Sequence, residues 1–371
     1  MRGNNVLGIV FSNMNEELIR EITDKRAMGS VPFGGRYRMI DFILSNMVNS
    51  GINKVGVITK SNYQSLMDHL GSGKAWDLSK RRNGLFILPP FGNSNGEFTN
   101  RIETLHSVIG FLENSKEDYV LLSDCDVVCN IDLKKVISSH IKRKSDITIV
   151  YSNGKVPKNI KDLLVVSLDE NQKIESISID PMTSNTYNFS FNMYLMGREL
   201  LIKIIRECFS LNKSNFKKDV LQSNVEKLNM YGYKFDGYYH IISSMSEYYN
   251  ANMEMMNPQV RKELFNSQKP IYTKVRDDMP TRYGLGSKVT NSLVANGCII
   301  EGEVENCVLF RGVKVGKGAK LSNCVIMQDS NIGNNTNLQY VIIDKDVTIN
   351  NNRTLMGFET YPVYINKASV V

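Results

Sequence analysis

The chain has 371 residues, 42% of them apolar and 22% charged, which is typical of a globular protein with more than one domain. No apolar run approaches the ~18 residues that cross a bilayer, and the first residues lack a signal-peptide pattern, so no membrane partner is expected. The net charge of +7 comes from scattered Lys and Arg, which excludes a nucleic-acid-binding arm. Six cysteines without a Cys-x-x-Cys pair predict reduced, packing side chains in a cytoplasmic protein.

The first two-thirds of the chain alternates short apolar runs with helical patterns. Strand and helix following each other in this way predict an α/β domain whose mostly parallel sheet is covered on both faces. Such sheets bind ligands beyond the carboxyl ends of their strands. In chain order we expect a strand over residues 6–11, a helix over 41–51 ending at Gly51, a strand over 54–60, a helix capped by Ser61 and ending at Gly71, a strand over 119–124, a helix opened by Asp132 and a strand over 146–151.

The last eighty residues repeat with a period of seventeen. Apolar residues five or six positions apart, with Gly or Asn between them as at Gly316, Gly333 and Asn350, fit the coils of a three-sided parallel β-helix. We expect about three coils. Three rows hold the register, namely Val304 with Leu321 and Leu338, Leu309 with Ile326 and Ile343, and Val315 with Ile332 and Ile349.

A family resemblance enters at VPFGGRYRMIDFILSNMVNSGI, residues 31–52, which is similar to the segment after the nucleotide loop of ADP-glucose pyrophosphorylases (glucose-1-phosphate adenylyltransferases). The resemblance covers almost the whole chain. It implies a Rossmann-like nucleotidyltransferase domain over residues 1–255, a linker over 256–288 and a left-handed parallel β-helix over 289–371. Further landmarks are Gln64-Ser65-Leu66 with His69, GSGKAWDL at 71–78, GLFILPP at 84–90 and FDGYY at 235–239.

The loop after the first strand departs from the family. Active members carry Gly-Gly-x-Gly-Thr-Arg-Leu there, so that bare backbone N–H groups and the Arg hold the nucleotide triphosphate. Residues 12–19 of this chain read SNMNEELI, with no glycine or Arg and with two acids, Glu16 and Glu17. Side chains obstruct the approach of a phosphate and carboxylates repel it, so we expect the usual triphosphate site to be lost.

The groups that stabilise phosphoryl transfer are also reduced. The family's phosphate-clamping Lys after Arg-Ala is replaced by Met28. Of the two Asp that would hold Mg²⁺, the first aligns with Asp126, with Asp124 as the alternative, and Ile241 stands at the second position. We therefore expect no metal site and no cofactor, with Asp126 the vestigial ligand if Mg²⁺ binds an active chain at all. Asp126 also fits an ordinary loop-starting Asp at a strand end.

The expected sugar-phosphate pocket is altered in the same way. The family's Lys for the glucose phosphate aligns with Asp180, which reverses the charge. Ser190 is kept, whereas a glycine beside the sugar becomes Asn192. The nucleotide-base segment with Gly84 is the best preserved part. The resemblance thus assigns Gly84, Asp126, Ser190 and Asn192 to the pocket.

A second candidate site lies at Arg36 and Arg38, just after Gly34-Gly35. In related pyrophosphorylases a basic residue of this segment contributes to binding a phosphorylated effector, and the Arg fork suits phosphate. The alternative is that both side chains pair with acidic neighbours on the surface.

A preserved fold with a dismantled active site is the pattern of the GlgD-type subunit of this family. The implied role is a regulatory subunit that assembles, as a tetramer, with a GlgC-type catalytic subunit and responds to a phosphorylated effector or nucleotide. The alternative is an active adenylyltransferase, which would need replacement cations such as Arg20, Lys25 or Arg26. A hexapeptide acyltransferase is disfavoured because the last His, His240, precedes the coils, and an oxidoreductase because no Gly-x-Gly-x-x-Gly follows the first strand.

Overall fold

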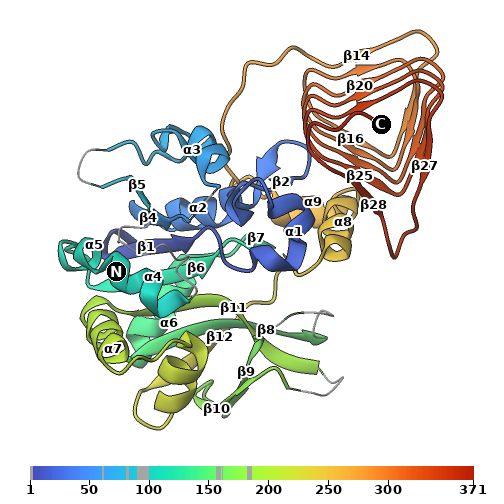
Figure 1. The fold of residues 1–371 in the computed structure, drawn as a ribbon. Coiled ribbons are helices and arrows are strands. Elements are labelled where there is room, and N and C mark those ends of the chain that lie inside the picture. The colour runs from blue at the N-terminus through green and yellow to red at the C-terminus, as the bar shows by residue number, and fades with distance from the viewer. Residues whose placement is uncertain are drawn as a thin grey trace.

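The computed structural model describes residues 3–60, 62–80, 83–89, 100–155, 160, 162–181 and 186–371. An α/β domain built on one large sheet is followed along the chain by a β-helix (Figure 1). No helix in these ranges is long and apolar enough to span a membrane. The six cysteines are free and buried, as expected for packing side chains.

The α/β domain is organised around a nine-stranded sheet. Its strands are β1 (Val6–Phe11), β4 (Lys54–Ile58), β5 (Leu85–Leu88), β6 (Tyr119–Asp124), β8 (Ile147–Lys155), β9 (Leu164–Leu168), β10 (Ile174–Ile179), β11 (Thr186–Gly197) and β12 (Met230–Lys234). The order is β10-β9-β11-β6-β1-β4-β5, with β8 between β11 and β12. Strands β1, β4, β5 and β6 are mutually parallel, and β11 runs antiparallel to β6 and β8. The predicted mostly parallel sheet is confirmed.

Helices cover both faces of this sheet, because alternate side chains of each strand point to opposite sides. In β1, Val6 and Val10 join one apolar cluster with α2 (Met39–Asn49) and α6 (Leu133–Arg143). Leu7, Ile9 and Phe11 join another with α4 (Arg101–Ser107) and α7 (Arg198–Ser210). The helices are α1 (Arg20–Thr23), α2 (Met39–Asn49), α3 (Gln64–Leu70), α4 (Arg101–Ser107), α5 (Ile109–Glu113), α6 (Leu133–Arg143), α7 (Arg198–Ser210), α8 (Met245–Glu254) and α9 (Pro258–Leu264). Two small antiparallel pairs complete the domain, β2 (Pro32–Phe33) with β3 (Tyr37–Arg38) and β7 (Val127–Cys129) with β13 (Tyr239–Ile241).

The predicted helix ends agree with the structure where they can be compared. The side chain of Asp132 accepts a hydrogen bond from the backbone N–H of Lys134 and so caps α6. Gly51 follows α2 with a φ of 84°, and Gly71 ends α3 with a φ of 50°. Ser61 lies outside the described residues.

The β-helix consists of three parallel sheets, each with five strands. The predicted rows are confirmed, since Val304 lies opposite Leu321 and Leu321 opposite Leu338 on adjacent coils. The expectation of about three coils is too low. The first coil is shorter than the repeat, with Val289 opposite Val304, and the last coil is longer, with Ile343 opposite Ile365, so neither shows in a search for seventeen.

The strands of the β-helix are short, and each sheet takes every third one. Their bounds are β14 (Arg282–Tyr283), β15 (Lys288–Thr290), β16 (Leu293–Val294), β17 (Ile299–Ile300), β18 (Glu303–Glu305), β19 (Val308–Leu309), β20 (Lys314–Val315), β21 (Lys320–Ser322), β22 (Val325–Ile326), β23 (Asn331–Ile332), β24 (Asn337–Gln339), β25 (Val341–Ile343), β26 (Thr348–Ile349), β27 (Thr354–Met356) and β28 (Val363–Ile365). The glycine at the predicted corner Gly333 is needed, because a Cβ there would lie 2.6 Å from the backbone N of Asn351 on the next coil.

The segment expected as a linker, residues 256–288, holds more structure than its composition indicates. It contains α9 and begins the first coil with β14, so the irregular part is residues 265–281. In the Met-rich stretch 253–256, Met255 is fully buried, Met253 and Met256 are half-buried and Glu254 is exposed. Met255 lies in an apolar cluster with Tyr248 of α8 and Phe310 of the β-helix, so the two units share a core.

Candidate functional site

The carboxylate of Glu16 forms hydrogen bonds that stabilise the loop after β1. Asn15 has a φ of 62°, and a 3-10 turn over Glu16–Ile19 follows it. One Oε1 atom of Glu16 accepts hydrogen bonds from Asn13 Nδ2 at 2.6 Å and from the backbone N–H of Met28 at 3.1 Å. An N–H that already donates to a carboxylate is not open to a phosphate, and the negative charge repels one. The loop therefore differs physically from an anion-binding loop.

Asp126 lies just beyond the carboxyl end of β6 and is 3% exposed. Asn15 Nδ2 donates to its Oδ2 at 2.5 Å, whereas its buried Oδ1 has no hydrogen-bond partner. Burial, with the nearby charge of Asp124, raises the pKa of Asp126 to about 7. A carboxyl that is only partly ionised at neutral pH is a weak ligand for Mg²⁺.

Asp124, the alternative metal ligand, is occupied by a cation of the chain. Arg101 Nη2 lies 2.7 Å from each of its carboxylate oxygens, and both side chains are buried. The guanidinium carbon of Arg101 lies 4.4 Å from the ring centre of Phe11 at the end of β1. No motif marks Arg101 in the sequence, so reasoning from the sequence missed it.

Asp126, Ser190 and Asn192, three of the residues that the resemblance assigns to the pocket, line one small pocket of the structure. Its volume is about 20 Å³, which is room for one water molecule and not for a sugar phosphate. Ile241 lines the same pocket from β13, opposite Val127, so the position expected for a second metal-binding Asp does face Asp126 but carries an apolar side chain. The described residues contain no group of three His, Cys, Asp or Glu side chains suited to a metal ion.

Asn192 fills the place where the resemblance implies a glycine. Its φ of 55° is in the left-handed region that glycine and asparagine favour, and β11 is irregular there. Its backbone N–H donates to Ser190 Oγ at 3.0 Å, and Tyr194 OH donates to its Oδ1 at 3.1 Å. The backbone conformation is thus one that glycine also adopts readily, while the asparagine side chain lines the pocket.

The side chain of Asp180 forms hydrogen bonds with nearby backbone N–H groups. Its carboxylate accepts hydrogen bonds from the N–H groups of Asp162 at 2.8 Å and Leu163 at 2.6 Å, which explains an acid at this position without a ligand. Lys217, which sequence reasoning did not single out, lines the pocket of Asp126, and its Nζ lies 3.1 Å from Asp162 Oδ2. The lysine that lines this pocket is therefore already paired with a carboxylate.

Gly84 does not line the pocket of Asp126 among the described residues. A Cβ at Gly84 would lie 2.6 Å from the carbonyl oxygen of Leu78 and 2.7 Å from that of Lys80. Packing against this backbone accounts for the glycine. Pro90, at the end of the same motif, lies outside the described residues.

Arg36 and Arg38 occupy different surroundings at the seam between the α/β domain and the β-helix. Arg38 Nη1 donates to Ser65 Oγ at 2.9 Å, and burial lowers its pKa to about 10. Arg36 is exposed, with its guanidinium 5.5 Å from the ring centre of Tyr37. Neither side chain forms an ion pair with any residue that the structure describes. The alternative of pairing with acidic neighbours is thus not what the described contacts show.

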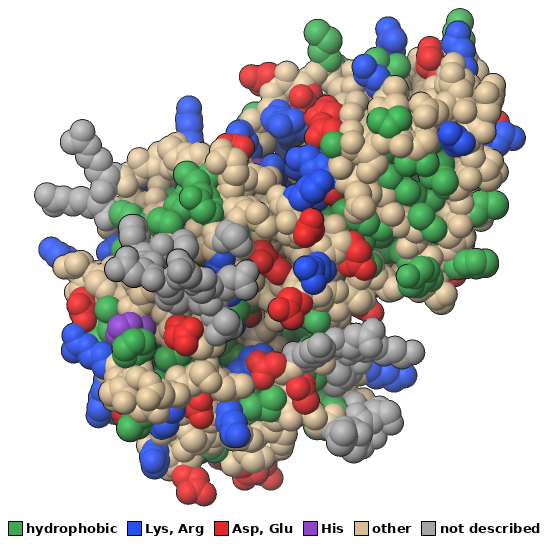
Figure 2. Space-filling model, in the orientation of Figure 1, with side chains coloured by type: hydrophobic (Ala, Val, Ile, Leu, Met, Phe, Trp, Pro, Cys, Tyr) green, Lys and Arg blue, Asp and Glu red, His purple; other side chains and the backbone are tan. Residues whose placement is uncertain are grey.

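The β-helix adds cations to this seam. Burial, and after it the charges of Arg38 and Arg26, lowers the pKa of Lys345 to about 6. Burial also lowers the pKa of Arg311, and the charges of Arg36 and Arg276 lower it further, while Asp278 Oδ2, 3.4 Å from Arg311 Nε, raises it. Figure 2 shows Lys and Arg side chains where the two units meet, with Asp and Glu side chains among them. Lys345 and Arg311 were missed because they lie far along the chain from the segment that they face.

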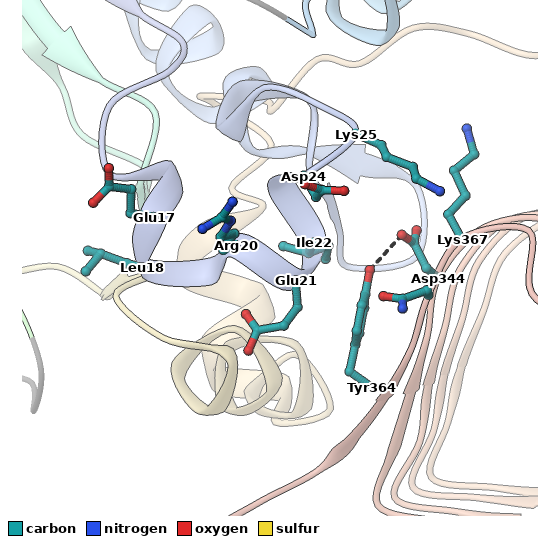
Figure 3. A pocket seen from close by; sticks show the side chains of 11 residues that line it. Glu17, Leu18, Arg20, Glu21, Ile22, Asp24, Lys25, Asp344, Tyr364 and Lys367 are labelled. Atoms are coloured by element: carbon teal, nitrogen blue, oxygen red, sulfur yellow. Dashed lines mark hydrogen bonds between the residues drawn. The ribbon is translucent and has the colours of Figure 1, made fainter. Parts of the chain in front are cut away.

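A larger pocket opens beside the same seam (Figure 3). Its volume is about 560 Å³, and it lies between the segment of residues 17–25 and the last coil. Lys25 and Lys367 point to the same side of it, while Tyr364 OH donates to Asp344 at 2.7 Å. Asp344 in turn forms a buried ion pair with Arg26, at 2.8 Å. Its volume suits a small ligand, but the carboxylates of Glu17, Glu21, Asp24 and Asp344 line it together with Arg20, Lys25 and Lys367, so the lining does not select an anion.

Comparison with known proteins agrees with both units. Residues 18–257 match the nucleotidyl transferase family, and residues 277–360 match the GlmU-like C-terminal hexapeptide family. The glycogen biosynthesis protein GlgD of Bacillus subtilis (strain 168) is 36% identical over 326 residues, covering 86% of this chain and 84% of that protein. The GlgD protein of Geobacillus stearothermophilus is also 36% identical, over 85% of this chain and 82% of its own length.

The chain belongs to the GlgD-type branch of the glucose-1-phosphate adenylyltransferase family. The glucose-1-phosphate adenylyltransferase of Geobacillus stearothermophilus is 33% identical, over 81% of this chain and 79% of that protein. The chain is thus related to proteins of glycogen biosynthesis, and its nucleotidyltransferase fold with a C-terminal left-handed β-helix is that of the family.

Proposed function

We propose that this chain is a catalytically deficient, regulatory GlgD-type subunit that modulates a GlgC-type catalytic subunit within a cytoplasmic hetero-oligomer, a tetramer. One observation carries the proposal, namely that the pocket around Asp126 has room for about one water molecule. Glu16 in the first loop, Ile241 at the second metal position and Asp180 at the sugar-phosphate position support it. No cofactor is assigned, and Mg²⁺ enters only if adenylyl transfer occurs.

The regulatory part of the proposal rests on the cation-rich seam. A phosphorylated effector, or a nucleotide, would bind there through Arg36 and Arg38, with Lys345 contributing from the β-helix. The supporting observation is that, besides burial, the charge of Arg38 lowers the pKa of Lys345 and the charge of Arg36 lowers the pKa of Arg311. None of Arg36, Arg38 and Lys345 forms an ion pair with a described residue. Binding at the seam and activity in the partner would be coupled through the assembly.

The test assays purified chain for ADP-glucose formation from ATP, glucose-1-phosphate and Mg²⁺, alone and mixed with a GlgC-type subunit. We expect negligible turnover alone and, in the mixture, a changed rate or a changed response to phosphorylated effectors. The matched control is Asp126→Asn, which we expect to behave like the unaltered chain in both assays. Robust turnover by the chain alone that Asp126→Asn abolishes would instead establish the alternative, an active adenylyltransferase.

A further inference from the structure

Two buried oxygen atoms in the lining of the small pocket have no hydrogen-bond partner among the described residues. They are Oδ1 of Asp126 and Oγ of Ser243, and these two residues are 3% and 2% exposed. An unsatisfied polar atom away from solvent costs free energy, so such atoms in native proteins normally find a partner. Because both oxygens line one pocket, a single molecule placed there would serve them both.

The polar side chains around the two oxygens are engaged elsewhere. Asn15 Nδ2 donates to the other carboxylate oxygen of Asp126, Oδ2, at 2.5 Å. Lys217 lines the pocket, but its Nζ lies 3.1 Å from Asp162 Oδ2 and donates to the carbonyl oxygen of Asp162. Ser190 Oγ accepts a hydrogen bond from a backbone N–H at 3.0 Å. The missing partner is therefore not one of these side chains.

Size and chemistry select water as the partner. The pocket volume is about 20 Å³, and a buried water needs roughly 10–15 Å³ of such volume and about two to four polar partners. Water donates to a carboxylate and accepts from a carboxylic acid, so it fits Asp126 in either protonation state. Mg²⁺ and Ca²⁺ take about six or more oxygen ligands, which two side-chain oxygens do not supply.

The two oxygens belong to segments that are far apart in the sequence and adjacent in the fold. Asp126 follows β6, and Ser243 lies between β13 and α8. The segments are already joined through their backbones, since the N–H of Ile242 donates to the carbonyl oxygen of Asp126 at 2.8 Å and Ile241 pairs with Val127. A molecule between the two side chains adds a second link at the same place.

We propose that this pocket is a hydration site, in which one buried water molecule bridges Asp126 Oδ1 and Ser243 Oγ. The water links the end of β6 to the segment that leads into α8. This inference goes beyond the proposed function, because it assigns a resident molecule to the pocket and not a partner or an effector to the chain. It also gives a role to Ser243, which no motif marks in the sequence.

The test is a high-resolution crystal structure of the unaltered chain and of two variants at Asp126. In the unaltered chain we expect a density peak within about 3.2 Å of both oxygens. Asp126→Asn is the matched control and should keep the peak, because its amide also forms hydrogen bonds with water. Asp126→Leu has a similar shape but no polar atom and should lose the peak. Crystals grown with Rb⁺ should show no anomalous signal in the pocket.

Long-lived waters are also counted in solution, by oxygen-17 magnetic relaxation dispersion. We expect one fewer in Asp126→Leu than in Asp126→Asn. If Asp126→Leu does not fold, Ser243→Val, whose methyl groups enter the pocket, should lose the same water.

Three results would overturn the proposal, namely an empty pocket in the unaltered chain, Lys217 Nζ bonded to Asp126 Oδ1, or an anomalous Rb⁺ peak at this place. Each of them would leave the proposed function standing. ADP-glucose formation by the unaltered chain would instead remove the proposed function, and it would leave the water of the ligand-free chain in place.

Discussion

The edge of the sheet and the seam beside the β-helix differ in the pairing of their cations with carboxylates. At the edge, Arg101 is paired with Asp124 and Lys217 with Asp162, and the remaining pocket is about 20 Å³. At the seam, Arg26 is paired with Asp344 and Arg311 with Asp278, whereas Arg38 and Lys345 form no ion pair with a described residue, and the charge of Arg38 adds to burial in lowering the pKa of Lys345. Paired charges in a filled space need no ligand, whereas clustered like charges are relieved by an anion. Under the proposed function, a ligand would bind at the second region rather than at the first.

The largest effect is expected where the seam is itself closed by an ion pair. Asp344→Asn leaves the buried guanidinium of Arg26 without a counter-charge, so we expect a loss of about 3–5 kcal/mol in the free energy of unfolding. Urea denaturation measures it. The exposed pair of Lys80 and Asp77 is the control, and Asp77→Asn should change stability by less than about 1 kcal/mol. Equal losses in the free energy of unfolding for the two substitutions would show that burial of the Arg26–Asp344 pair does not add to its contribution to stability.

A smaller effect, of opposite sign, is expected at the edge of the sheet. Because the folded chain raises the pKa of Asp126 to about 7, it binds the proton more tightly than the unfolded chain does. The stability from this group is therefore complete below about pH 4 and is lost as the pH rises to about 7. Asp126→Asn should gain roughly 1–3 kcal/mol at pH 8 and little at pH 4, measured by thermal unfolding at both values. A uniform loss of stability would contradict the assigned protonation.

Sulfate binding tests the seam, because the charge of sulfate is constant from pH 6 to pH 9. Bound anion favours the protonated form of Lys345, whose pKa is otherwise about 6, so sulfate affinity should weaken as the pH rises above 6. Lys345→Met should cost about tenfold at pH 6, or ~1.4 kcal/mol, and flatten the pH dependence. The exposed Lys320 on the same β-helix is the matched control. Sulfate affinity is measured by titration calorimetry. If Lys320→Met lowered it as much as Lys345→Met does, sulfate would not bind at Lys345 and the proposed seam site would be wrong.

The smallest effect is expected for Asn192→Gly. Glycine adopts the φ of 55° readily, so the change should cost at most about 1 kcal/mol through the lost hydrogen bond from Tyr194. Thermal unfolding measures the cost. Enlarging the pocket in this way should not restore glucose-1-phosphate binding, because Ile241 and Asp180 remain. Recovered binding would show that Asn192 alone closes the pocket.

The sequence predicted the fold well because burial repeats along the chain. Inward residues of stacked coils must align, so the seventeen-residue rows appear directly as the pairing of Val304 with Leu321. The shorter first coil and the longer last coil break this period and were missed. Losses at the site were predicted for the same local reason, since Glu16 and Met28 are visible as substitutions in a motif.

The occupants of the site could not be predicted in this way. Arg26 meets Asp344 across 318 positions, and nothing near either residue indicates the other. Arg101 and Lys217 are isolated basic residues without a motif, and only the folded sheet places them beside Asp124 and Asp162. Ion pairs of this kind depend on long-range contacts rather than on local pattern.

Helix α8 connects the β-helix to the α/β domain. Tyr248 is fully buried among residues of both units, so the β-helix cannot tilt without carrying α8 along. The chain just before α8 holds Asp126, because the backbone N–H of Ile242 donates to the carbonyl oxygen of Asp126 at 2.8 Å. A displacement of the β-helix would therefore be transmitted through α8 and Ile242 to the backbone of Asp126.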